Sequence, residues 1–389
     1  MVRALLACLL WAASAGAWAQ HDHGQGKPAL AVSAVFDGEG RLWLAQAREK
    51  QLWVSHSGDK GRSFSSPVAV NAVPETIAAD GENRPKIIVA PQGQLYVSWT
   101  QSLDKPYTGN VRFARSSDGG KTFSEPVTVN DNRAVISHRF ESLLVDGSGR
   151  IHLVWLDKRD AAAAQAVGKK YAGAALYHAV SDDGGQTFRA NRLLAANSCE
   201  CCRVATALDA DGVPLVFWRH IFGANVRDHA LLKLDGQSGL VRVSYDQWEI
   251  DGCPHHGPTM AVARDGTRHL AWFNDAPEHH GLFYAGMRPD GAMSRPISFG
   301  NYAAQAMHPS VQALGKSVVL AWKEFDGERA VVLSMSSRDG GRSWQAPRRI
   351  AETFGASDHP LLITDGATVY LSWNTAQEGY RLLPIESGR

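Results

Sequence analysis

The sequence predicts an all-β protein that forms a β-propeller of seven blades, with six blades as the alternative. Two repeats alternate along the chain and support this prediction: an eight-residue turn motif built around Asp, and a short apolar strand that ends in Trp. The composition agrees, because 44% of the 389 residues are apolar and the chain contains 37 glycines and 12 tryptophans. Glycine serves tight turns and tryptophan is enriched in β-sheet.

The composition also excludes several other classes of protein. An intrinsically disordered chain has fewer apolar and aromatic residues, and a small disulfide-rich domain is shorter and richer in cysteine than a chain with five. The formal net charge is +1, so no excess of Lys and Arg indicates a nucleic-acid-binding protein. The chain is long enough to bury a large hydrophobic core.

The N-terminal segment predicts export. Met1-Val2-Arg3 supplies a positive charge, residues 4–15 are apolar and Ala17-Trp18-Ala19 is a small-x-small cleavage site, which are the three parts of a signal peptide. A lipoprotein signal at Cys8 is the alternative, although most of the apolar run follows that cysteine. We expect a signal peptide over 1–19, a His-containing segment over 20–27 and one propeller domain over 28–389, in a periplasmic or secreted protein. No later segment reaches the ~20 apolar residues of a membrane-spanning helix.

The turn motif reads Ser-x-Asp-x-Gly-x-(Ser/Thr)-(Phe/Trp) and occurs four times, at 57–64, 116–123, 181–188 and 337–344. In a hairpin turn, an Asp carboxylate accepts hydrogen bonds from the backbone of its own turn and Gly supplies a positive φ. The aromatic residue that closes the motif can then pack between neighbouring sheets. Each motif is therefore expected to connect two antiparallel strands.

The second repeat is the strand that ends in Trp. Seven copies lie 50 to 63 residues apart, ending at Gln46, Trp99, Trp155, Trp218, Trp272, Trp322 and Trp373. Each unit reads as a strand, a Gly-containing turn, the strand ending in Trp, a third strand, an Asp turn and a fourth strand. About four strands per unit of this length are typical of a propeller blade. The last unit lacks a clear fourth strand after Leu382-Leu383-Pro384.

The turn motifs resemble the Asp boxes (BNR repeats) of the sialidase-like β-propellers, and the resemblance covers essentially the whole chain after the signal peptide. It implies the fold rather than the activity, because Asp boxes in that family lie on hairpins away from the catalytic centre and unrelated activities share them. Known sialidases have six blades, whereas the repeats of this chain number seven.

The strand order predicts where a site would form. In a propeller, the first strand of each blade lines the central channel, and the loops that enter it share one face with the loops that leave the second strand. The Asp turns fall on the opposite face. Polar and charged residues precede several of the first strands: Arg84, His138, Arg139, Cys202, Arg203, His255, His256, His308 and His359. A concave polar mouth of the channel is therefore the expected site.

All four cysteines that remain after the signal peptide fall in two such loops on adjacent blades. Cys199, Cys201 and Cys202 precede one blade, and Cys253-Pro254-His255-His256 opens the next. Two interpretations stay open at this stage. Disulfide bonds, for example between Cys253 and one of the other three, suit an exported protein with an even number of cysteines. Thiolates and imidazoles at this density also suit copper or zinc, and the metal ligands would then be Cys199, Cys201, Cys202, Cys253, His255 and His256.

The resemblance implies a glycosidase as the alternative function. Sialidases bind the substrate carboxylate with three arginines and use a Tyr backed by a Glu as nucleophile, together with an Asp as acid/base. A planar anion favours bidentate guanidinium contacts, and a Tyr nucleophile needs a neighbouring base. By position the candidates are Arg84, Arg139 and Arg219, with Arg203 as a further arginine, and the pair Tyr302 and Glu141. The Arg84-Pro85 segment differs from the Arg-Ile-Pro segment of the family in residue order and in its place after the first Asp box.

Three functions therefore remain open. The first is an exported propeller that binds a transition metal, with copper as the first candidate, at the channel mouth. The second is a sialidase-like hydrolase of acidic sugars, and the third is a protein-binding propeller with structural disulfides. A metal ion or a small acidic ligand is the expected partner at the mouth, and no nucleic acid or membrane span is expected.

Overall fold

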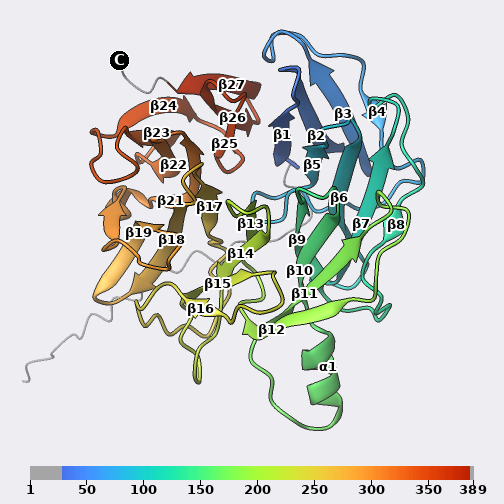
Figure 1. Ribbon diagram of the computed structural model, residues 1–389, viewed down its shortest axis with the longest axis horizontal. Helices are drawn as coiled ribbons and strands as arrows, with labels where there is room; N and C mark the ends of the chain where they lie inside the picture. The colour runs from blue at the N-terminus through green and yellow to red at the C-terminus, as the bar shows by residue number, and fades with distance from the viewer. Residues whose placement is uncertain (1–28, 386–389) are drawn as a thin grey trace, which may run out of the picture.

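Seven antiparallel sheets lie around a central axis in the computed structural model of the protein (Figure 1), which describes residues 29–385. The prediction of a seven-bladed propeller is confirmed. The predicted signal peptide, and the His-containing segment that follows it, lie outside the described residues. Within the described range, no helix combines the length and apolar character needed to cross a membrane.

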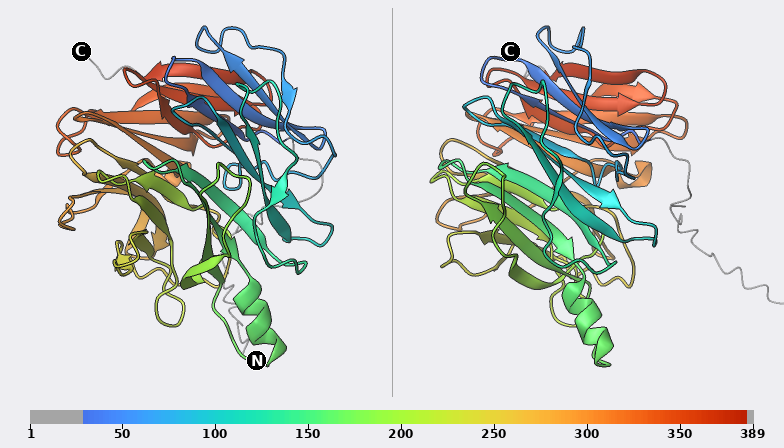
Figure 2. Two further views of the ribbon diagram at one scale, coloured as in Figure 1. Left: turned by 45° about the vertical axis from the view of Figure 1, so that its right-hand side comes forward. Right: turned by 90° about the vertical axis from the view of Figure 1, so that its right-hand side faces the viewer.

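Each blade is made of strands that are consecutive in the chain, and the seventh blade has three strands where the others have four. In chain order the blades are β1–β4 (Val32–Phe36, Leu42–Arg48, Gln51–Ser57, Val68–Ala69), β5–β8 (Lys86–Val89, Leu95–Ser102, Gly109–Ser116, Val127–Thr128), β9–β12 (His138–Val145, Ile151–Asp157, Ala174–Ser181, Arg192–Ser198), β13–β16 (Ala205–Leu208, Pro214–Arg219, His229–Lys233, Val241–Arg242), β17–β20 (Thr259–Val262, Arg268–Ala276, His279–Met287, Ile297–Phe299), β21–β24 (Met307–Leu314, Ser317–Phe325, Ala330–Ser337, Arg348–Thr353) and β25–β27 (Leu361–Thr364, Val369–Thr375, Gly379–Ile385). Helix α1 (Arg159–Ala166) follows β10 and projects from the ring (Figure 2), and the short 3₁₀ helix η1 (Tyr302–Ala304) precedes β21.

The first strands of neighbouring blades contact one another all the way around the ring, from β1 through β5, β9, β13, β17 and β21 to β25 and back to β1. They are therefore the innermost strands, as the repeat order predicts. Loops that enter them converge at one end of the channel. The turns between first and second strands and between third and fourth strands lie at the other end.

The core lies between the blades rather than within a single sheet. The second strand of each blade is flanked by strands on both sides and by sheets on both faces, so nearly all of its side chains are buried; all seven residues of β10 are buried. Trp272 of β18, for example, packs in one cluster with Phe217 of β14 in the preceding blade. Burying the indole N–H requires a hydrogen-bond partner, and Trp155 and Trp322 donate to the carboxylates of Asp157 and Glu324 near the channel mouth.

The four Asp boxes share one hydrogen-bond pattern. In the box at 116–123, the Asp118 carboxylate accepts from the hydroxyl of Ser116 (2.7 Å), the backbone N–H of Thr122 (3.0 Å) and its hydroxyl (2.6 Å), while Gly120 N–H donates to the Ser116 hydroxyl (2.9 Å). The same contacts recur around Asp59, Asp183 and Asp339. Each box joins the third strand of its blade to the fourth, as expected for a hairpin turn.

The glycine at the fifth position of an Asp box also lies in the contact with the preceding blade. A Cβ added to Gly185 would lie 2.4 Å from the ring of Phe113 in the preceding blade, and one added to Gly120 would lie 2.7 Å from the ring of Trp43. Both glycines have a positive φ. The motif therefore serves the contact between blades as well as its own turn.

Replacing Gly185 by Ala is expected to lower the free energy of unfolding by about 2–4 kcal/mol, because a left-handed φ (+83°) and a clash with Phe113 act together. Gly184 is the matched control, since it also has a left-handed φ (+69°) but the nearest atom to an added Cβ is 3.8 Å away. Gly184→Ala should cost only the backbone strain, about 1 kcal/mol. Urea denaturation of both variants measures the difference, and equal losses would show that the contact with Phe113 is unimportant.

Blades 7 and 1 close the ring through side chains, together with an arginine of the loop that enters blade 2. The Arg84 guanidinium forms a two-pronged ion pair with the Asp358 carboxylate (3.0 and 3.1 Å), and Asp358 also accepts from Val32 N–H (3.1 Å). Asn374 Nδ2 donates to the carbonyl of Leu30 (2.9 Å). Among the described residues, no sheet contains strands from both ends of the chain.

Candidate metal centre at the channel mouth

The four cysteines gather at the channel mouth because two entry loops lie side by side. The loop between β12 and β13 holds Cys199, Cys201 and Cys202, and the loop between β16 and β17 holds Cys253. The Sγ atom of Cys199 lies 3.6 Å from that of Cys202 and 3.9 Å from that of Cys201. These three thiols are buried in the contact between blades 3 and 4, whereas Cys253 is exposed.

Cys201 belongs to two groups of metal-ligand atoms. In the first, the sulfurs of Cys199, Cys201 and Cys202 lie within 4.8 Å of one another, and in the second, Cys201, Cys253 and a ring nitrogen of His255 do so. The structure therefore brings together five of the six residues that the sequence marks as metal ligands.

His256, the sixth, faces a different neighbourhood. Its ring packs against Phe273 (4.1 Å between centroids) and lies 4.9 Å from the ring of His308. Its Nδ1 atom is buried without a hydrogen-bond partner. Because the chain turns at His255, which has a positive φ, two histidines adjacent in sequence point to two different sites.

Two guanidinium groups make the thiol cluster electropositive. Arg227 Nη1 lies 3.4 Å from Cys199 Sγ. Hydrogen bonds from the Cys201 and Cys202 thiols, aided by Arg219 and Arg227, hold the pKa of Cys199 well below its usual range, although burial opposes the shift. The hydrogen bond to Cys199 raises the pKa of Cys201, and burial raises that of Cys202. The metal-free cluster thus favours one thiolate, at Cys199, supported by two protonated thiols.

The disulfide interpretation is not confirmed. A disulfide needs two sulfurs at ~2.05 Å, whereas the described cysteines are all free thiols, and the sulfurs of Cys199 and Cys202 lie 3.6 Å apart. Cys253, the expected partner of a bridge between blades, contacts the carboxylate of Glu200 at 3.7 Å.

Two of the three arginines that would bind a substrate carboxylate have other partners. Arg84 is paired with Asp358. Arg219, 1% exposed, donates to the backbone carbonyls of Arg227, His256 and Phe273. Arg139 packs over the ring of Phe140. Arg84 and Arg219 thus hold loops and blades together, whereas the Nε of Arg139 is buried without a hydrogen-bond partner among the described residues.

Tyr302 and Glu141 do not meet. The Tyr302 hydroxyl donates to the carboxylate of Asp275 at the surface, whereas Glu141 is buried in β9 and accepts from the Thr100 hydroxyl (2.7 Å). The Tyr–Glu pair that the family resemblance implies is therefore not formed: η1 lies between blades 5 and 6, and β9 belongs to blade 3.

A buried carboxylate that sequence reasoning missed lies at the centre of the mouth. Glu82, in the loop before β5, accepts from Arg203 Nη1 (2.6 Å) and from the backbone N–H groups of Arg203 (3.0 Å) and Gly257 (2.7 Å). It also contacts Nδ1 of His308 (3.3 Å) and of His359 (3.6 Å), whose rings stack at 3.3 Å. Burial alone would raise its pKa, but Arg203 and the two imidazoles hold the pKa well below the usual value.

Glu82 thus links the entry loops of blades 2, 4, 5 and 7 to the start of β21 in blade 6. No sequence motif marks it, although its place two residues before Arg84 in an entry loop is a signal that the strand order could have supplied. Arg203, named in the sequence as a candidate for substrate binding, is its ion-pair partner.

Comparison with known proteins gives independent support for the fold. No protein-family model matches the sequence, and no curated protein matches it. Several solved structures match the structure of this chain. The BP39L lectin from Burkholderia pseudomallei is 11% identical with a TM-score of 0.55, covering 92% of this chain and 98% of its own. An ulvan lyase of polysaccharide lyase family PL25 is 10% identical with a TM-score of 0.54, covering 91% and 94%.

A leech intramolecular trans-sialidase is 12% identical with a TM-score of 0.51, covering 89% of this chain and 82% of its own. At these identities the similarity concerns the fold alone. Together with the seven sheets around a channel, it shows that this chain has the fold of a sialidase-like β-propeller.

Proposed function

We propose that this propeller binds a transition metal ion, with copper as the first candidate and zinc as the second, through the thiols of Cys199, Cys201 and Cys202, with Cys253 and His255 as an adjoining group of ligands that shares Cys201. The observation that supports the proposal is the spacing of the sulfurs. Two sulfurs bound at ~2.3 Å to one tetrahedral ion lie about 3.8 Å apart, and the two described distances from Cys199 are 3.6 and 3.9 Å. The cluster therefore needs little rearrangement to accept a metal.

The ligand set favours a soft ion. Thiolates select Cu(I) and Zn(II) over hard cations such as Mg²⁺, and the donors of this cluster are sulfur and imidazole. Several thiolates in a buried site would be costly without compensating positive charge. Arg227 and Arg219 provide that charge beside Cys199. Cys253, exposed at the surface, gives the ion a route into the buried thiols through Cys201.

The test is a competition titration of the reduced, full-length mature protein with Cu(I) against a chromophoric chelator. We expect about one ion per chain, and we expect Cys199→Ser/Cys202→Ser to weaken binding by more than ~100-fold, beyond what loss of an outer-shell contact costs. His280→Asn is the matched control, because His280 lies exposed at the same mouth outside the cluster. Protein that retains no metal, and whose four thiols are paired when counted by mass spectrometry after export, would refute the proposal.

A carbohydrate ligand is the second candidate. Its support is a cavity of about 380 Å³ beside η1, lined by His256, Phe273, Tyr302 and Met307, in which the half-exposed Tyr302 ring sits next to the Asp275 carboxylate. An aromatic face beside a carboxylate suits a sugar ring and its hydroxyls. The solved structures of similar fold include a lectin, a polysaccharide lyase and a trans-sialidase. A fluorogenic sialoside assay, extended to other acidic glycosides, tests hydrolysis, and absence of turnover on all of them would exclude it.

A further inference from the structure

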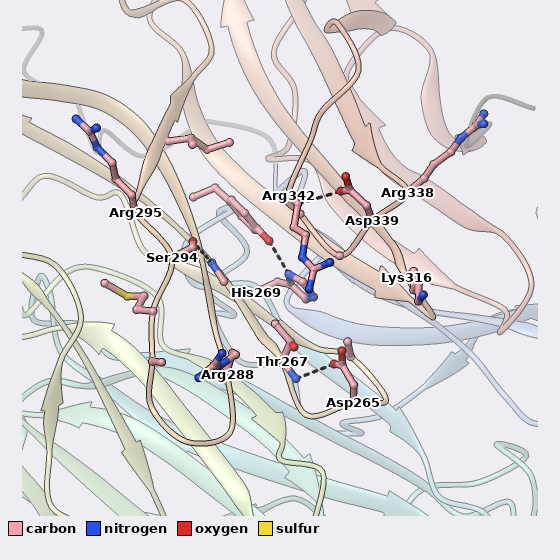
Figure 3. Close-up of a pocket in the computed structure, with 18 of the residues that line it drawn as sticks. Asp265, Thr267, His269, Arg288, Ser294, Arg295, Lys316, Arg338, Asp339 and Arg342 are labelled. Carbon is pink, nitrogen blue, oxygen red and sulfur yellow. Dashed lines mark hydrogen bonds between the residues drawn. The ribbon is translucent and has the colours of Figure 1, made fainter.

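A groove lies between blades 5 and 6 on the face that carries the Asp boxes, at the end of the channel opposite the metal centre. Four turns form its walls: 263–267 between β17 and β18, 288–295 between β19 and β20, 315–316 between β21 and β22, and the Asp box of blade 6. Its volume is about 810 Å³, within the size range of ligand-binding clefts. Figure 3 shows the side chains of this groove, with those of the Asp box on one side and those of the blade-5 turns on the other.

The groove is strongly cationic although the protein as a whole is nearly neutral, with a formal net charge of +1. Its lining contains two carboxylates and five cationic side chains, Arg288, Arg295, Lys316, Arg338 and Arg342. Arg288 is paired with Asp290 at the surface. Within residues 29–385, the other four cationic side chains form no ion pair.

The two carboxylates do not neutralise these cations by direct contact. The oxygens of Asp339 accept hydrogen bonds from Ser337, Arg342 N–H and Ser343 inside the Asp box. Asp265 accepts from the backbone of its own turn, at Thr267. Figure 3 shows Arg342 extending from the Asp box into the groove toward His269, with Arg295 and Arg338 at its rims.

This distribution favours a ligand with several separated negative charges. The cations come from several turns rather than from one point, so a single phosphate could not reach them all. Guanidinium groups bind carboxylate and sulfate oxygens through paired hydrogen bonds. A single-stranded nucleic acid is less suited, because it needs aromatic faces for base stacking. The aromatic ring in the lining, that of Tyr284, is buried, with its hydroxyl on His269 and its ring against Trp344.

We propose that this groove, named here the Asp-box groove, binds an anionic polysaccharide, a chain that carries sulfate or uronic-acid groups. The groove is open between two blades, so an extended chain can pass along it. The site is independent of the metal centre, which lies at the other end of the channel and uses none of these residues.

The experiment measures binding of a fluorescently labelled sulfated oligosaccharide, such as a heparin octasaccharide, by anisotropy at about 100 mM salt. Arg342→Glu is expected to weaken binding about tenfold or more and to reduce the dependence of affinity on salt concentration. Arg62→Glu is the matched control, because Arg62 occupies the same position in the Asp box of blade 1 and is exposed. It should change the affinity by less than about twofold, since it lies outside the groove.

Three outcomes would overturn the proposal. Equal losses in the two variants would show that binding is non-specific attraction to surface arginines. Tighter binding of single-stranded DNA of the same length, with the same sensitivity to Arg342→Glu, would assign the groove to nucleic acid. If the wild-type protein does not bind the sulfated octasaccharide, anionic polysaccharides are not ligands of the groove. None of these results depends on metal, so failure here and failure of the metal centre are distinguishable.

Discussion

Replacing Asp358 by Ala is expected to lower the free energy of unfolding by about 3–5 kcal/mol, the cost of leaving one member of a buried ion pair without its partner. The Arg84 side chain is 9% exposed, so its guanidinium would be left buried without a counter-charge. Val32 N–H would lose its acceptor at the same time. Urea denaturation followed by tryptophan fluorescence measures the loss, and we expect cleavage by added protease to appear first near the contact between blades 7 and 1.

Two further variants test whether the loss in Asp358→Ala comes from the buried, unpaired charge of Arg84. Burial raises the pKa of Asp358 even with Arg84 beside it, which indicates that the pair compensates the cost of burying its charges only in part. Arg84→Met/Asp358→Leu should therefore recover part of the lost stability, because it removes the buried charge that Asp358→Ala leaves behind but still leaves Val32 N–H without its acceptor. Lys60→Met removes the ion pair with Asp365 from its exposed side, at the contact between blades 7 and 1, and should cost less than about 1 kcal/mol. A loss from Lys60→Met as large as that from Asp358→Ala would show that the burial of the Arg84–Asp358 pair is unimportant.

Replacing Glu82 by Gln is expected to lower the free energy of unfolding by about 3 kcal/mol at neutral pH. Gln can still accept a hydrogen bond, but it leaves the Arg203 guanidinium without a counter-charge beside two buried imidazoles. The effect should be visible in denaturation midpoints. Glu352→Gln is the control, because Glu352 pairs with Arg329 and Arg349 at the surface, and it should change the midpoint little.

The stability difference between wild type and Glu82→Gln is also expected to depend on pH, in a definite direction. The folded-state pKa of Glu82 lies well below the ordinary value of 4.5, so the carboxylate stabilises the fold at every pH above about 4.5 and loses that contribution as the pH falls through its folded pKa. The difference between wild type and Glu82→Gln should therefore be constant from neutral pH down to about pH 5 and shrink at lower pH. A difference that grows on acidification would contradict the depressed pKa.

Local repeats explain why so much of the fold could be predicted. The hydrogen bonds that the Ser and Asp side chains of an Asp box make join residues within four positions of each other, so the turn can be recognised from sequence alone. The same holds for the strands that end in Trp. The gathering of the four cysteines could also be foreseen, because equivalent loops of adjacent blades must meet at one mouth.

Contacts between distant blades explain what was missed. Whether an arginine is available for a ligand depends on partners far along the chain: Arg84 is paired with Asp358, 274 residues away, and Arg203 with Glu82, 121 residues away. Periodicity contains no information about such pairs. For the same reason adjacent histidines could not be separated in advance, although the positive φ of His255 directs His256 to another site.

The arrangement of blades as uninterrupted stretches of chain has a consequence for evolution and engineering. Because each described sheet is built from consecutive strands, every boundary between described sheets falls in a loop. A circularly permuted chain, opened in any connection between blades and joined across blades 7 and 1, would keep every strand pairing. Duplication or deletion of one repeat would likewise add or remove a complete sheet. The number of blades can therefore change in one step, with no intermediate protein that contains an incomplete sheet.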